Sequence, residues 1–64
     1  MGTIDNITIY YEPNDKCIYV KSATNGLRNK FENISKDSYK TEFIKVINDY
    51  IEEDDIELIY YSNL

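Results

Sequence analysis

One segment of this chain repeats its apolar residues with the period of an α-helix. Within residues 36–53, apolar side chains recur three or four positions apart, which places them on one helical face. The members of this face are Tyr39, Phe43, Val46, Ile47 and Tyr50, and Ile44 and Ile51 are expected to widen it. Ser35 or Asp37 is predicted to cap the N-terminus, because short polar side chains accept hydrogen bonds from the first free amides. A chain with one amphipathic helix needs a second surface against which to bury it.

The preceding residues alternate between apolar and polar with the period of two that is typical of strands. Residues 3–12 and 17–22 each show this alternation. The apolar members of one face are Ile7, Ile9 and Tyr11 in the first segment, and Ile18 and Val20 in the second. Between them, residues 13–16 begin with proline and contain Asn and Asp, which favour a turn. We therefore predict that the first two strands form an antiparallel hairpin.

Residues 23–34 allow two interpretations. Asn25-Gly26 favours a type I′ turn, because both residues tolerate positive φ angles. The alternation that follows predicts a third strand. Alternatively, Leu27 and Phe31, four residues apart, pack as one helical turn within a loop. The strand is the preferred interpretation, and the question is left open for residues 27–34.

Residues 56–61 form the last predicted strand, with Ile56, Leu58 and Tyr60 on one face. The chain is thus expected to be a single α+β domain over residues 1–64. Its order is strand, strand, possible third strand, helix, strand. The sheet is small and mainly antiparallel, with three to four strands, and the amphipathic helix packs on one of its faces. A chain of this length has room for only one core.

The chain lacks the residues that several classes of catalytic, phosphate-binding and metal-binding site require. The chain has no histidine, the usual acid–base group at neutral pH, and Cys17 therefore has no histidine to activate it. Cys17 is interpreted as a small apolar side chain. No glycine-rich phosphate loop or Cys/His zinc spacing is present, and residues 52–57 lack the glycine and spacing of a calcium loop. We expect a protein that is not an enzyme and that uses no cofactor or metal.

The expected compartment is the cytoplasm, or the host cytoplasm if the chain is phage-encoded. A single cysteine permits no internal disulfide, which favours a reducing compartment. Residues 1–6 lack the basic and apolar regions of a signal peptide. No stretch approaches the roughly 20 apolar residues that cross a bilayer.

Negative charge gathers near the C-terminus. Residues 1–48 carry a net charge of +1, whereas residues 49–64 carry −6 and no basic side chain. The acidic end consists of Asp49, Glu52, Glu53, Asp54, Asp55 and Glu57. Carboxylates at a helix C-terminus are unfavourable by up to about 1 kcal/mol each. They form either a solvated end that keeps the domain soluble or a surface that docks on a basic groove.

Tyrosine is the second unusual feature, with seven copies in 64 residues. If the apolar faces named above meet the helix, alternation places a different set of side chains on the opposite face of the sheet. This aromatic face contains Tyr10, Tyr19, Ile59 and Tyr61. It reflects either ordinary strand preference or a protein-binding surface, since tyrosine is enriched at interfaces.

These features predict a small acidic protein-binding module. We expect an inhibitor or adaptor that docks on a larger protein with a basic, nucleic-acid-handling surface. Anti-defence inhibitors from phages and mobile elements, including those of CRISPR effectors, offer an analogy of size and charge only. One alternative is a self-associating structural module that forms a homodimer. A second is a single-strand nucleic-acid binder that stacks bases on tyrosine, ranked lower for lack of a basic surround. No direct nucleic-acid binding and no membrane partner are expected.

Overall fold

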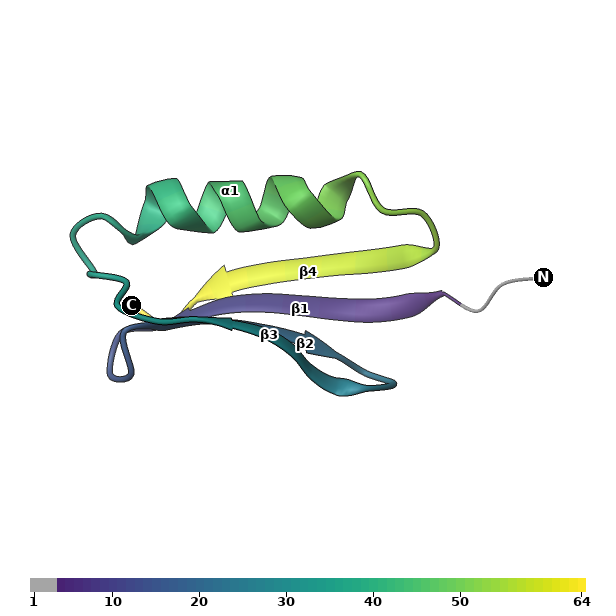
Figure 1. The fold of residues 1–64 in the computed structure, drawn as a ribbon, viewed down its shortest axis with the longest axis horizontal. Helices are drawn as coiled ribbons and strands as arrows, with labels where there is room; N and C mark the ends of the chain where they lie inside the picture. The colour runs from purple at the N-terminus through teal and green to yellow at the C-terminus, as the bar shows by residue number, and fades with distance from the viewer. Residues whose placement is uncertain (1–3) are drawn as a thin grey trace.

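A four-stranded sheet with one helix across one face forms the fold (Figure 1), as seen in a computed structural model that describes residues 4–64. Its elements are β1 (Asp5–Glu12), β2 (Cys17–Ser22), β3 (Gly26–Phe31), α1 (Tyr39–Ile51) and β4 (Ile56–Ser62). The predicted α+β class is confirmed. The first strand was expected to include Thr3, which lies outside the described residues.

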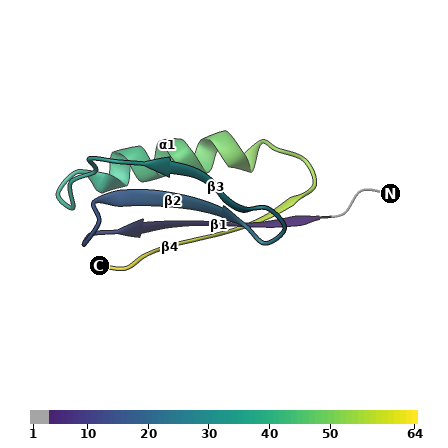
Figure 2. The same ribbon diagram turned by 60° about the horizontal axis from the view of Figure 1, so that its bottom comes forward.

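The sheet is mixed, with the strand order β3-β2-β1-β4. β2 pairs antiparallel with both β1 and β3, whereas β4 pairs parallel with β1. The presence of β3 explains why β4 runs parallel to β1. Three antiparallel strands end at one end of the sheet, and α1 then returns the chain to the end where β1 starts (Figures 1 and 2). β4 therefore runs in the same direction as β1, and the preference for a third strand over a loop is confirmed.

The turn between β2 and β3 differs from the predicted type I′ turn. Gly26 has a φ of 78°, but Asn25 is not among the residues with positive φ. The Ser22 hydroxyl oxygen accepts hydrogen bonds from the amides of Thr24 and Asn25, both at 3.1 Å. The connection is thus a three-residue loop, residues 23–25, followed by the left-handed Gly26 at the start of β3, as in three-residue hairpin loops that end in a glycine bulge.

A bulge in β3 redirects Arg28. Val20 pairs with Asn29 and Lys21 with Leu27, so Arg28 is an extra residue without its own partner in β2. A bulge can re-aim a side chain, and here the Arg28 guanidinium lies 5.2 Å from the Tyr50 ring centroid on the helix. The bulge also puts Leu27 and Phe31 on opposite faces: Leu27 pairs with Lys21 and is exposed, whereas Phe31 pairs with Ile18 and packs against the core.

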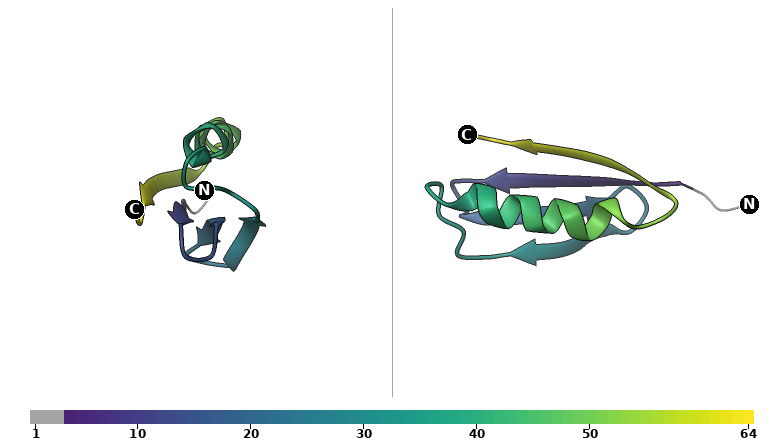
Figure 3. Two further views of the ribbon diagram at one scale, coloured as in Figure 1. Left: turned by 90° about the vertical axis from the view of Figure 1, so that its left-hand side faces the viewer. Right: turned by 90° about the horizontal axis from the view of Figure 1, so that it is seen from above.

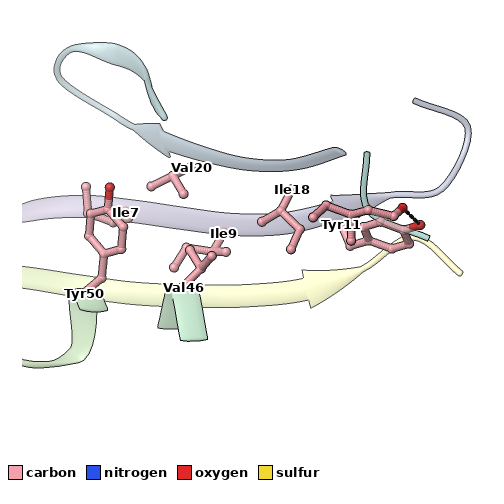
Figure 4. Packing of buried hydrophobic residues seen from close by; sticks show 8 residues of the cluster. Ile7, Ile9, Tyr11, Ile18, Val20, Val46 and Tyr50 are labelled. Atoms are coloured by element: carbon pink, nitrogen blue, oxygen red, sulfur yellow. Dashed lines mark hydrogen bonds between the residues drawn. The ribbon is translucent and has the colours of Figure 1, made fainter. Parts of the chain in front are cut away.

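The core lies between α1 and the strands β1 and β2. It contains Ile7, Ile9, Tyr11, Ile18, Val20, Ile34, Val46 and Tyr50. Figure 4 shows Val46 and Tyr50 reaching from the helix towards the strand residues. The buried Tyr11 hydroxyl donates a hydrogen bond of 2.7 Å to the carbonyl oxygen of Ile34, so the loop before α1 is tied to the core. Burial raises the pKa of Tyr11 above its ordinary value of 10.0.

The helix is shorter than predicted, beginning at Tyr39 rather than at residue 36 and ending at Ile51. Neither Ser35 nor Asp37 caps it. Ser38 occupies the N-cap position without a side-chain cap, and the Ser35 hydroxyl instead accepts a hydrogen bond from the Asp37 amide. Ile44 and Ile51 do not widen the buried stripe and are 57% and 63% exposed.

The single helix leaves much of the sheet uncovered. Seen from above, α1 lies over the middle of the sheet, and β4 lies to one side of it (Figure 3). The face turned away from α1 has no covering element among residues 4–64. At 13 residues, α1 is also too short and too polar to cross a membrane.

Replacing Val46 with Ala should destabilise the fold by about 1.5–3 kcal/mol, because the buried methyl groups are lost from the core. Urea unfolding followed by circular dichroism measures the change. Thr41→Ala, at an exposed position of the same helix, should change the free energy of unfolding by less than about 0.5 kcal/mol. Equal effects of the two substitutions would contradict this placement of the core.

Candidate interaction surfaces

Three tyrosines form a row across the face of the sheet opposite α1. Tyr10 in β1 lies directly opposite Tyr19 in β2 and Tyr61 in β4. The Tyr10 ring centroid is 5.2 Å from that of Tyr19 and 5.4 Å from that of Tyr61, and both pairs are stacked. Ile59, two residues before Tyr61, lies on the same face. The predicted placement of all four residues is confirmed, and their partner-binding role remains a prediction.

Stacking decides what this tyrosine row (Tyr19, Tyr10 and Tyr61) can offer a partner. Tyr10 has another ring on each side, so few ring faces are free to stack on an added group. The row instead presents ring edges and hydroxyl groups. Such edges suit the mixed apolar and hydrogen-bonded contacts of a protein interface better than the base stacking of single-strand binders.

Two lysines flank the row, and the sequence interpretation missed them. Lys21 Nζ lies 5.4 Å from the Tyr10 ring centroid, and Lys30 Nζ lies 5.7 Å from that of Tyr19. These distances allow cation–π attraction. Pairing of β3 with β2 places Lys30 there. The third strand was therefore the sequence feature from which the position of Lys30 could have been predicted. The face is therefore less acidic than the whole chain.

A hollow of about 370 Å³ adjoins the row beside the turn from β1 to β2. Its lining residues are Asp15, Lys16, Cys17, Tyr19, Lys30, Glu32 and Asn33. The Tyr19 hydroxyl donates a 2.9 Å hydrogen bond to the Asp15 carboxylate, and this bond, followed by burial, raises the pKa of Tyr19. Cys17 is buried and donates to the Asp15 carbonyl oxygen at 3.1 Å. Each of these polar groups already has a partner within the turn.

The acidic end runs from Asp49 in the last turn of α1, through the connection to β4, to Glu57 in β4, and all six of its carboxylate residues are exposed. Glu53 is paired with Arg28 at 3.4 Å, between Oε2 and Nη1. Among residues 4–64, the other five carboxylates form no ion pair, and the last turn of α1 has no basic residue. The chain's own lysines therefore leave this charge largely uncompensated.

One acidic residue also has a backbone role. Asp55 has a φ of 62°, a left-handed conformation in which aspartate is several-fold enriched. Its carbonyl oxygen accepts a 2.9 Å hydrogen bond from the Asp5 amide, which starts the pairing of β4 with β1. Asp55 thus serves the turn as well as the charge of the acidic end.

The start of β4 and the tyrosine row lie near opposite ends of this strand. Ile56 pairs with Asp5 at the acidic end, whereas Tyr61 pairs with Tyr10 in the tyrosine row. Five residues separate these pairs, which corresponds to about 17 Å at roughly 3.3 Å per residue. Glu57 is the exception: it shares a sheet face with Ile59 and Tyr61 and lies two residues before Ile59. The structure therefore joins Glu57 to the aromatic face, whereas the carboxylates that precede β4 lie away from the tyrosine row.

Comparisons with known proteins identify no relative. No protein-family model, no curated protein and no solved structure matches this chain. Among residues 4–64, no three Asp, Glu or Cys side chains gather so that they could hold a metal ion.

Glu52→Lys should raise the free energy of unfolding by about 0.3–1 kcal/mol, because a cation at the C-terminus of α1 is favoured by the helix dipole. Chemical denaturation at low ionic strength measures the effect. Asp37→Lys makes the same charge change near the opposite pole and should lower stability. A stabilisation by both variants would show that total charge, rather than position, controls stability.

Asp15→Asn should lower the pKa of Tyr19, because the charged acceptor of its hydrogen bond is lost. A raised phenol pKa stabilises the fold below pH 10, the ordinary tyrosine value, and this stabilisation is lost as pH rises through the folded-state pKa. Tyrosinate absorbance during alkaline titration reports the change. Glu32→Gln, in the same hollow, should leave the titration unchanged, and an equal shift would refute the assigned cause.

Proposed function

We propose that this protein is a small binding module whose acidic end docks on a basic surface of a larger protein. The observation that carries the proposal is the set of five exposed carboxylates without an ion pair among residues 4–64. They gather at the helix pole where negative charge lowers stability. Positions that oppose local stability are more often functional than average.

The preferred target is a protein that handles nucleic acid. Such proteins line their channels with Lys and Arg to bind phosphates. A projecting group of carboxylates complements such a channel and competes with nucleic acid for it. Complementary charge also accelerates association and makes it sensitive to salt. The module would thus act as an inhibitor or adaptor, in analogy with the small acidic anti-defence inhibitors of phages and mobile elements.

The proposed action is binding rather than catalysis. The chain has no histidine, and the carboxylates of the acidic end lie on an exposed helix terminus rather than in a cleft. The proposed location is a reducing cytoplasm, which suits a buried cysteine without a second cysteine to pair with. No cofactor is part of the proposal.

The test is capture of a target from a lysate by the immobilised protein at low salt, followed by quantification of the same target at high salt. Changing Glu52, Glu53, Asp54 and Asp55 to Gln or Asn should reduce capture at least tenfold. A single-stranded or duplex oligonucleotide added as competitor should displace the captured target, because both ligands occupy the same basic surface.

A matched control removes the same number of negative charges elsewhere. Glu12, Glu32, Asp37 and Glu42 are changed to Gln or Asn, which gives the same net charge but keeps the acidic end. This variant should capture the target as the unchanged protein does. Equal loss in both variants would assign the effect to net charge, and no loss in either would remove the acidic end from the interface.

A further inference from the structure

The two edges of the sheet differ in their protection against pairing with another chain. β3 carries the polar residues Arg28, Asn29 and Lys30, and its pairing with β2 contains a bulge. Both features oppose the addition of another strand at this edge. β4 has the sequence Ile-Glu-Leu-Ile-Tyr-Tyr-Ser, with no basic residue and no proline. Its register with β1 is continuous over all seven residues. Only the β4 edge is therefore an extended, regular strand with high strand preference.

The side chains of β4 are also the most exposed apolar group of the sheet. Ile59 is 58% exposed, Tyr60 is 55% exposed and Tyr61 is 46% exposed. Tyr60 is on the helix side and contacts Phe43 edge to face, with ring centroids 6.3 Å apart. It remains half exposed because α1 lies over the middle of the sheet rather than over β4 (Figure 3). Both faces of β4 thus present uncovered apolar surface next to its open edge.

We propose that β4 pairs with β4 of a second copy of this chain, antiparallel and about a two-fold axis at Ile59. This is the register in which all seven residues of β4 are paired, because Ile59 is the central residue of Ile56–Ser62. Ile59 then lies opposite Ile59 of the other copy, and Leu58 lies opposite Tyr60. Each pair shares one face of the joined sheet, as direct cross-strand neighbours must. The product is a continuous eight-stranded sheet.

Charge favours this antiparallel pairing over a parallel pairing of two β4 strands. Glu57 lies opposite Tyr61, so a carboxylate meets a phenol rather than another carboxylate. The other carboxylates of the two acidic ends, which precede β4, lie at opposite ends of the joined strands. A parallel arrangement would instead place both acidic ends side by side, where like charges repel. A second copy therefore fits this edge without opposing its own charge.

The apolar area is sufficient for a modest interface. Six large apolar side chains on β4, the adjoining C-terminus and one flank of α1 are about half exposed: Ile44, Ile51, Ile59, Tyr60, Tyr61 and Leu64. The three on β4 lie at the joint itself. With aromatic side chains of about 150–250 Å², β4 and its open backbone edge contribute on the order of 500 Å² per copy. Two copies together then reach about 1,000 Å², the lower range for a specific interface.

Sedimentation across a concentration series tests the pairing directly. The unchanged protein should shift from the mass of one chain to that of two as concentration rises. Ile59→Lys should remain a single chain throughout, because two lysines would meet at the two-fold axis. Circular dichroism should show that this variant keeps its fold, since Ile59 is exposed in the single chain. A single-chain mass at every concentration for the unchanged protein would overturn the proposal.

Leu27→Lys is the matched control at the other edge, where Leu27 is 54% exposed. It should self-associate as the unchanged protein does, and loss of the dimer in this variant would refute pairing through β4. Ile59→Cys should form an interchain disulfide under mild oxidation, whereas Leu27→Cys should not. This interface is independent of the proposed docking function, because the variant with four neutralised carboxylates at the acidic end should still form the dimer.

Discussion

A single 13-residue helix must protect a four-stranded sheet, and the rest of the structure follows from that imbalance. One helix can bury roughly one face of two strands, here β1 and β2, which supply most of the core. The opposite face and the outer strand β4 remain open to solvent. In a chain that buries only about 60% of its unfolded surface, such open areas are difficult to avoid. They place the tyrosine row and the β4 edge where a partner can reach them.

The acidic end is likewise exposed to solvent at a cost to the stability of the fold. Arg28 compensates Glu53 only because a bulge directs the guanidinium towards the end of α1. That contact is exposed to solvent and contributes at most about 1 kcal/mol. The remaining carboxylates follow one another closely in sequence around a helix end and a left-handed turn, and they have no ion pair among residues 4–64, so repulsion between like charges persists in the folded state. A partner with the opposite charge would relieve this repulsion on binding.

Much of the fold was predictable because the short-range periodicity of apolar residues determines where the helix and the first two strands form. Alternation identified which faces of β1 and β2 are buried, and it placed Tyr10 and Tyr61 on the outer face. Features that depend on pairing between strands were not accessible in the same way. The direction of β4 depended on whether a third strand exists, and Lys30 joined the tyrosine row only through the register of β3 with β2. The bulge at Arg28 interrupts the alternation of β3, so sequence alternation alone could not assign the face of Leu27.

The predicted helix boundaries were wrong for a different reason. Periodicity marks the apolar face of a helix but not its first residue, which depends on local hydrogen bonds. Ser35 accepts a bond from the Asp37 amide and so stabilises a turn before the helix begins. Ile44 and Ile51 are apolar, yet they lie outside the buried face of α1 and are exposed. Composition alone cannot define the width of a buried stripe.

Pairing of the first strand with the last has a consequence for how the chain reaches its native state. β1 is a central strand, but one of its two neighbours is separated from it by about fifty residues of sequence. The hairpins that join β1, β2 and β3 close short loops and can form early, whereas docking of β4 closes a loop of about fifty residues. During synthesis on the ribosome, one side of β1 therefore stays unpaired until residues 56–62 emerge. Its backbone amides and the isoleucines beside them are exposed to chaperones, or to other nascent chains, for that interval.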